Sequence, residues 1–159
     1  MVLLFTFSTA FSQDEWGCSK PNKKAQKLYD KAQQLNFKGE DSYRSLIEAV
    51  KLQEDYTEAL SVLAYINARK FEQYPENLRI QNRVISYYEK TREACPAYRN
   101  YEGSFWVAKF NYDQRAYDQS YTYVTEYLSN SKSKNGKELE QAQEIKLRIE
   151  QYKELFKNT

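Results

Sequence analysis

The chain has 159 residues and a nearly balanced charge, with 24 Lys and Arg residues against 22 Asp and Glu residues. This balance predicts no nucleic-acid partner and no electrostatic attraction to anionic lipid. The chain contains no His, the commonest general base and metal ligand, and two Cys alone cannot complete a zinc site. We therefore expect no catalytic residues, no metal and no cofactor, and we expect the protein not to be an enzyme.

Residues 1–12 are apolar and uncharged, which is typical of a signal peptide. Ala10 and Ser12 place small residues at the two positions that a signal peptidase recognises before Gln13. The run is too short to span a bilayer, which needs about 20 apolar residues, so we expect no transmembrane span. An apolar tail without a targeting role is the alternative. Residues 13–20 then form a flexible lead to the fold.

Cys18 and Cys95 are the only cysteines. An exported chain meets an oxidising compartment in which they could form a disulfide. If two helix pairs lie between them, both residues fall at the same end of an antiparallel stack, so the topology permits the bridge. Two free thiols are the alternative.

Apolar residues at three- and four-residue steps predict a single all-α domain over residues 21–158. Helix-favouring residues are abundant, and four Gly and three Pro are too few turn formers for a many-stranded β fold. The predicted helices cover residues 21–38, 42–53, 56–71, 76–94, 101–112, 116–128 and 137–157.

The first four helices have recognisable end signals. Gly39 is expected to end the first helix, and Asp41 or Ser42 to cap the second. Pro75 is expected to end the third helix, and Pro96 to end the fourth.

The last three helices are separated by a turn at residues 113–115 and a polar loop at residues 129–136. The final helix, residues 137–157, is expected to be a capping helix whose charged face meets water. Its predicted apolar face consists of Leu139, Ala142, Ile145, Ile149, Tyr152 and Leu155.

An order of large, small and aromatic residues recurs along the chain. It runs through Val107, Ala108, Tyr117, Ser120, Val124, Tyr127 and Leu128, and returns at Leu63, Ala64, Tyr88 and Thr91 and more loosely at Leu28, Ala32, Gly39, Leu46 and Ala49. A period of roughly 34 residues with two helices per unit indicates a helix-pair solenoid.

This pattern resembles the tetratricopeptide repeat, with about three units followed by the capping helix. Ala64 and Ala108 match the small residue at which the two helices of a repeat touch, and Tyr88 and Val124 match the large residue of the second helix. Pro96 matches the proline that ends a repeat. The first unit is about two residues short and has Lys31 at an apolar position, and the second has an insertion of about eight residues at 71–78, which predicts longer helices or an enlarged turn.

A narrower resemblance is to the N-terminal repeat domain of exported OmpA-family proteins of the Bacteroidetes, including the PorE-like component of type IX secretion. It rests on the signal that ends with Ala10, Phe11 and Ser12 before Gln13, on Cys18 followed by Lys20, Pro21, Asn22, Lys23, Lys24 and Ala25, on Cys95 with Pro96, and on Tyr127 and Leu128 before a loop and a helix rich in Glu and Leu. The resemblance implies a periplasmic location and an association with the outer membrane or peptidoglycan through a domain missing from this sequence. The alternatives are a stand-alone repeat protein and the leading part of a longer product.

In the repeat family, the first helix of each pair lines a concave groove that holds an extended peptide or a partner helix. The resemblance therefore implies a groove at Tyr29, Gln33, Glu58, Tyr65, Arg69, Glu102, Phe105, Lys109 and Tyr112, with Gln26, Asn36 and Ser61 at further groove positions. Arg69 and Lys109 could hold a carboxylate, and Glu58 and Glu102 a basic residue. The alternative for the aromatic residues Tyr29, Tyr65 and Phe105 is packing between helices.

Two functions fit these expectations. The first is a non-catalytic adaptor that binds a protein or peptide of the cell envelope or of a secretion system in its groove. The second is a chaperone-like or structural periplasmic protein that holds export clients.

Overall fold

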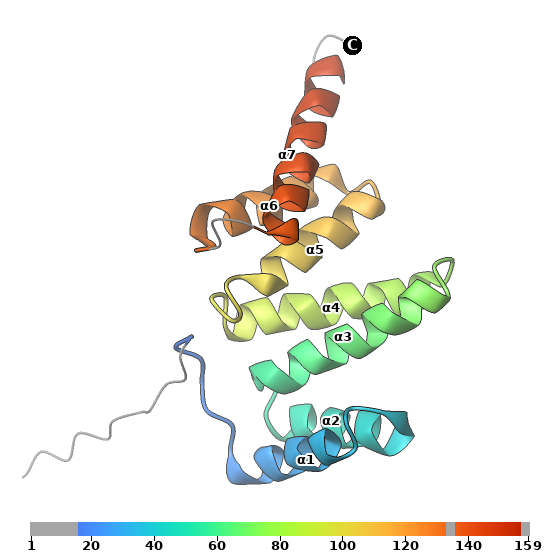
Figure 1. Ribbon diagram of the computed structural model, residues 1–159, viewed down its shortest axis with the longest axis vertical. Helices are drawn as coiled ribbons and strands as arrows, with labels where there is room; N and C mark the ends of the chain where they lie inside the picture. The colour runs from blue at the N-terminus through green and yellow to red at the C-terminus, as the bar shows by residue number, and fades with distance from the viewer. Residues whose placement is uncertain (1–15, 133–135, 157–159) are drawn as a thin grey trace, which may run out of the picture.

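A computed structural model describes residues 16–132 and 136–156 of the chain (Figure 1). These residues form seven helices and no strand. The helices are α1 (Lys23–Gln34), α2 (Gly39–Leu52), α3 (Thr57–Gln73), α4 (Leu78–Ala94), α5 (Glu102–Asp113), α6 (Tyr117–Asn130) and α7 (Lys137–Phe156). The predicted all-α fold with seven helices is confirmed. The expected signal peptide, residues 1–12, lies outside the described residues.

The helices stack in the order of the sequence, from α1 and α2 at one end of the molecule to α7 at the other (Figure 1). Helices α1 and α2, α3 and α4, and α5 and α6 form three pairs, and each pair contacts the next through α2 with α3 and α4 with α5. Helix α7 packs on α6 and also reaches α5. This arrangement is a helical solenoid, in which each unit is buried by its neighbours.

The core follows the solenoid axis because each junction between helices buries its own apolar cluster. Ala32, Ala64 and Ala108 are completely buried, one in the first helix of each pair. The largest fully buried side chains include Leu46 in the first pair and Tyr127 in the third. The small residues allow close approach of the helices, and the large ones fill the space between them.

The start of the stack differs from the prediction in its helix ends. The side chain of Asn22 caps α1 by accepting hydrogen bonds from the Lys24 and Ala25 amides at 3.0 and 2.9 Å. Helix α1 ends at Gln34, and Gly39, expected to terminate it, is instead the first residue of α2. The chain turns between them through two left-handed residues, Asn36 and Phe37, at φ 51° and 54°.

The predicted cap of α2 is also corrected. Lys38 precedes α2 and makes no side-chain cap, while Asp41 and Ser42 lie inside the first turn. Ser42 is fully buried, and its hydroxyl donates to the Ala32 carbonyl oxygen of α1 at 3.3 Å. The Ser42 hydroxyl therefore links α2 to α1 and does not cap the N-terminus of α2.

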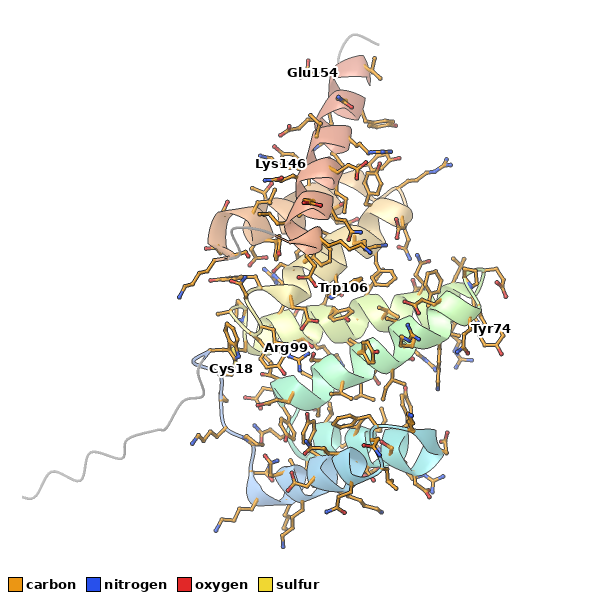
Figure 2. The ribbon with its side chains drawn as sticks, in the orientation of Figure 1. Cys18, Tyr74, Arg99, Trp106, Lys146 and Glu154 are labelled. Atoms are coloured by element: carbon orange, nitrogen blue, oxygen red, sulfur yellow. A yellow bond between two sulfur atoms is a disulfide. The ribbon has the colours of Figure 1, made fainter. Side chains whose placement is uncertain are left out.

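The predicted insertion at residues 71–78 lengthens the second pair. Helices α3 and α4 have 17 residues each, against 12 and 14 in the first and third pairs. Their joined tip, which carries Tyr74, projects beyond the neighbouring pairs (Figure 2). Tyr74 and Leu78 are 55% and 66% exposed, so the tip contributes apolar surface and little core.

Cys18 and Cys95 form a disulfide with a Cα–Cα distance of 5.3 Å. The sequence left open a disulfide or two free thiols, and the structure has the disulfide. Both cysteines are buried together with Tyr98, and Trp16 packs against them. The described part of the predicted lead, residues 16–20, is thus attached to the end of α4, and the Gln53 side-chain nitrogen Nε2 also donates to the Lys20 carbonyl oxygen at 3.4 Å.

Helix α7 departs in part from the expected capping helix. Ala142, Ile145 and Ile149 are buried as predicted, whereas Leu155, assigned to the same face, is 74% exposed. Tyr152 still contacts α6, with its ring 4.6 Å from that of Tyr117, whereas the end of α7 extends past α6 and leaves Leu155 uncovered (Figure 1). Within residues 16–132 and 136–156, no helix is both long and apolar enough to cross a bilayer.

Candidate interaction groove

A groove of about 790 Å³ lies along the outward face of α3. The turn between α1 and α2 forms one wall, and the connection between α4 and α5 forms the other. The lining residues are Asn36, Phe37, Lys38, Ser61, Val62, Tyr65, Ile66, Arg69, Lys70, Gln73, Arg99 and Glu102.

Helix α3 presents its groove residues at the spacing of one helical face. Tyr65, Ile66 and Arg69 lie three, four and seven residues after Val62, a spacing that places side chains on the same side of a helix. Tyr65 is 59% exposed, although Leu63 and Ala64 beside it are fully buried. Val62 and Ile66 also pack against the core cluster shared by α1, α2 and α3, and together with the exposed Tyr65 they form the floor of the groove.

The connection between α4 and α5 places Arg99 at the groove through an uncommon backbone. Arg99, Asn100 and Tyr101 have φ values of 45°, 59° and 67°, three consecutive left-handed conformations without a glycine. The Asn100 side chain secures this loop by donating to the Ser131 hydroxyl at 2.8 Å and accepting from the Lys132 amide at 2.6 Å. Such conformations persist only where surrounding contacts hold them.

The disulfide supports the same loop from the other side. Tyr98 packs against Cys18 and Cys95, and the Arg99 guanidinium lies over the Tyr98 ring at 5.4 Å. Figure 2 shows Arg99 and Cys18 on the same side of the stack. The position of Arg99 is therefore coupled to the attachment of the N-terminal lead.

Arg99 and Glu102 form an ion pair at this end of the groove, with 3.7 Å between Nη1 and Oε2. Burial raises the pKa of the Glu102 carboxyl, while the Arg99 charge opposes the rise. Burial also raises the pKa of Tyr98 to about 12, and the Glu58 charge adds to this rise. At this end of the groove, the charges of Arg99 and Glu102 therefore compensate each other, and the neighbouring Tyr98 phenol is uncharged.

The other end of the groove is basic. The Lys70 ammonium lies over the Tyr43 ring at 4.8 Å from its centroid, and Lys38 faces the same groove from the α1–α2 turn. Arg69 is paired with Glu72 at 2.8 Å, and both side chains are 61% exposed. Among all lining residues, four are basic and one is acidic.

The structure brings together part of the predicted groove. Tyr65, Arg69 and Glu102 line it, as do the further positions Asn36 and Ser61. Gln33 is exposed on α1 but is not among the lining residues. Glu58 is half-buried, with one carboxylate oxygen out of contact with solvent.

Two predicted aromatic residues serve packing instead. Phe105 is fully buried in the core between α5, α6 and α7, so its placement in the groove is corrected. Tyr29 is half-buried, with its ring 5.5 Å from that of Phe37 and 5.4 Å from that of Tyr56. The sequence allowed either a groove position or core packing for Tyr29, Tyr65 and Phe105, and in the structure Tyr65 lines the groove.

Lys109 and Tyr112 belong to a different surface. They line a smaller cavity of about 180 Å³ between α5 and α7. Lys109 is paired with Asp113 at 3.0 Å, and α7 lies along this part of α5. The continuous wall expected along all three first helices is therefore interrupted at the third, because α7 packs against α5.

Sequence reasoning missed Lys38, Lys70 and Arg99. Lys38 and Arg99 lie in the connections between helices. The paths of these connections depend on left-handed residues such as Phe37 and Tyr101, whose conformation cannot be predicted from the residue type. Lys70 could have been found, because it follows Ile66 by four residues on α3.

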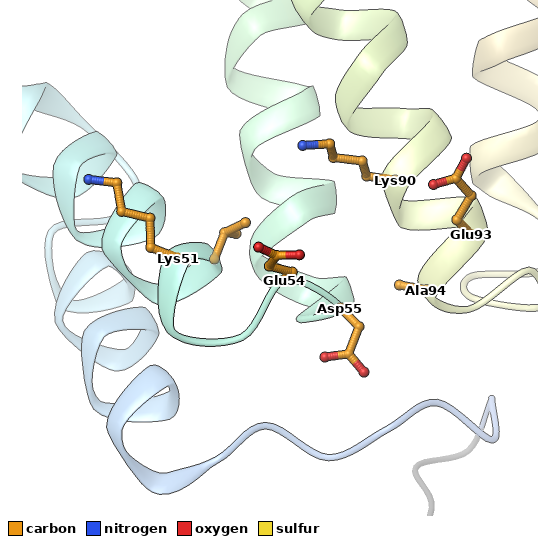
Figure 3. Close-up of a pocket in the computed structure, with 7 residues that line it drawn as sticks. Lys51, Glu54, Asp55, Lys90, Glu93 and Ala94 are labelled. Atoms are coloured by element: carbon orange, nitrogen blue, oxygen red, sulfur yellow. The ribbon is translucent and has the colours of Figure 1, made fainter.

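A second cavity, of about 520 Å³, lies at the junction of the first two pairs (Figure 3). Its charged residues are Lys51, Glu54, Asp55, Lys90 and Glu93. The acidic and basic side chains nearly balance, and Lys51 is already paired with Glu48 at 2.7 Å. In the part of the chain that the structure describes, no cluster of three or more His, Cys, Asp and Glu could hold a metal ion.

Comparison of the chain with protein-family models, with curated proteins and with solved structures finds no match. The resemblance to tetratricopeptide repeats and to PorE-like proteins stays a prediction from the sequence.

Proposed function

We propose that the protein is a non-catalytic scaffold that binds an extended segment of another protein in the groove along α3. The observation that carries the proposal is the exposed Tyr65 side chain, which lies beside the half-buried Val62 and Ile66 between two walls from other elements. An exposed aromatic side chain in a concave site supplies contact area at a small cost in conformational entropy.

The cellular setting is part of the proposal. The apolar, uncharged residues 1–12 support export, and the bridge between Cys18 and Cys95 suits an oxidising compartment. We propose a periplasmic adaptor for a cell-envelope or secretion-system component. The resemblance to PorE-like repeat domains supports this assignment.

Site-specific photocrosslinking tests the groove. A photoreactive amino acid in place of Tyr65 should capture a partner from envelope extracts, whereas the same amino acid in place of Gln143, exposed on α7, should not. An adaptor should give one dominant adduct, and a holder of export clients should give many. Equal capture at both positions would contradict the groove.

Charge reversal provides a second test with a matched control. Arg69→Glu changes the groove, while Lys109→Glu makes the same change in charge outside it. We expect the first variant to weaken capture at Tyr65 and the second to leave it unchanged. Both should have similar melting temperatures, because Arg69 is exposed, Lys109 is half-buried at the surface, and charges that water reaches contribute little to stability.

Sequencing the N-terminus of the mature protein tests export. Cleavage after Ser12 predicts a mature chain that begins at Gln13. A periplasmic fraction that retains residues 1–12 would contradict the proposed signal peptide.

A further inference from the structure

The charges of the groove identify the chemistry of its occupant, and this step rests on the proposed function. We propose that the groove selects an extended segment with an acidic side chain at the Lys38 and Lys70 end and an apolar side chain about four residues away, against Val62.

The basic end of the groove has two lysines that pair with no carboxylate in the described part of the chain. Arg69 is paired with Glu72, and Arg99 with Glu102. Within the described residues, neither Lys38 nor Lys70 takes part in an ion pair. A carboxylate from a partner would therefore meet uncompensated positive charge here and would not have to displace an existing acidic neighbour.

The two lysines come from different elements, so a partner side chain can be contacted from both sides. Lys38 lies on the turn between α1 and α2, and Lys70 on the fourth turn of α3. The Tyr43 ring holds the Lys70 ammonium at 4.8 Å, which restricts the side chain before a partner binds. A fixed cation loses less conformational entropy on binding than a free lysine.

The apolar part of the groove sets the distance between the acidic and the apolar side chain of the bound segment. Val62 and Ile66 lie one turn apart on α3, with Phe37 on the facing wall. From Val62 to Lys70 the helix rises about 12 Å, at 1.5 Å for each of eight residues. An extended chain covers that distance in about four residues, at 3.3 Å each.

The opposite end of the groove adds no second preference for an acid. Arg99 and Glu102 compensate each other there, and the neighbouring Tyr98 is a neutral phenol. The selection for negative charge is thus confined to one end, which gives the bound segment a defined register.

A displayed library of random eight-residue peptides tests this inference with full-length protein. Peptides retained by the wild type should be enriched in an Asp or Glu about four residues from a large apolar residue. The variant that carries Lys38→Glu and Lys70→Glu should lose the acidic enrichment and retain peptides with Lys or Arg instead. Lys109→Glu is the matched control and should retain the wild-type peptides.

Synthetic peptides with blocked termini then separate an acidic side chain from a free C-terminal carboxylate. By fluorescence anisotropy, replacing the Asp of an enriched peptide with Asn should weaken binding about tenfold, since two charged contacts are lost. Added salt should reduce the difference between the two peptides.

The outcomes separate the inference from the proposed function. If peptides are retained through Tyr65 but carry no acidic preference, or if the lysine reversals leave the preference unchanged, the inference is overturned and the groove remains a binding site. If the library gives no enrichment and Tyr65 captures no partner, the proposed function itself fails. Circular dichroism of the lysine variant verifies that the fold is intact.

Discussion

The Ser120 hydroxyl donates a hydrogen bond to the Ala108 carbonyl oxygen at 2.8 Å, which joins α6 to α5 inside the third helix pair. Ser42 makes the corresponding bond to Ala32 in the first pair, at 3.3 Å. In both pairs, a buried alanine allows the second helix to approach, and a buried serine finds an acceptor across the contact. The sequence repeat therefore corresponds to a repeated contact between helices.

Replacing Ala108 with Glu should unfold the third pair. The side chain is completely buried, so a carboxylate there would be desolvated without a partner, at a cost of several kcal/mol. Thermal unfolding followed by circular dichroism should show a large decrease in Tm. Lys109→Glu, at the next position, is half-buried and should change Tm little. An unchanged Tm for Ala108→Glu would contradict the packing of α5 against α6.

Replacing Cys18 and Cys95 with Ser should reduce the free energy of unfolding by about 2–4 kcal/mol, as measured in urea. The bridge closes a loop with a sequence separation of 77 residues and so restricts the unfolded chain. Both thiols of the wild type should resist alkylation until a reductant is added. Immediate labelling of native protein would show that the bridge is not formed.

Adding a methyl group at Gly103 tests the contact between α4 and α5. A Cβ there would lie 3.1 Å from Arg92 Cβ and 3.2 Å from the Tyr88 carbonyl oxygen, and the backbone of α4 cannot move cheaply. Ala is favoured over Gly in helices by about 1 kcal/mol, but the required shift should outweigh this gain. We expect Gly103→Ala to lower Tm, whereas Gln119→Ala, exposed on α6, should not.

The helices could be predicted from the sequence because each has an apolar stripe at helical spacing. The last helix, for example, begins at Lys137 both in the prediction and in the structure. The turns could not be predicted in the same way. Gly39 is a common signal for a helix end, yet the chain reverses at Asn36 and Phe37, whose left-handed backbone has no signal as strong as glycine. This difference moved the start of α2 and made Lys38 a groove residue.

The groove expected along the first helices of all three pairs forms along α3, and the basic residues of its walls, Lys38 and Arg99, could not be predicted for the same reason. Tyr65 and Arg69 follow from helical spacing alone. Arg99 depends on a loop held by Tyr98 and Asn100, which are distant in sequence from Cys18 and Lys132, their respective partners. The position of Lys109 depends on the packing of α7, which no pattern within α5 specifies.

The last prediction concerns pH and Glu102. Burial raises the pKa of this carboxyl above its ordinary value of 4.5, so the native state binds the proton more tightly than the unfolded state. The resulting contribution to stability is fully present below pH 4.5 and is lost as the pH rises through the raised native pKa. Glu102→Gln removes the titration, so the stability of the variant relative to the wild type should increase as the pH rises through this window.

Urea unfolding at several pH values between 4 and 8 measures this difference. The stability of the Glu102 variant relative to the wild type should increase as the pH rises. A Glu102 variant that loses stability relative to the wild type as the pH rises would show that the ion pair with Arg99 outweighs the cost of burial, and would reverse the sign of the pKa shift.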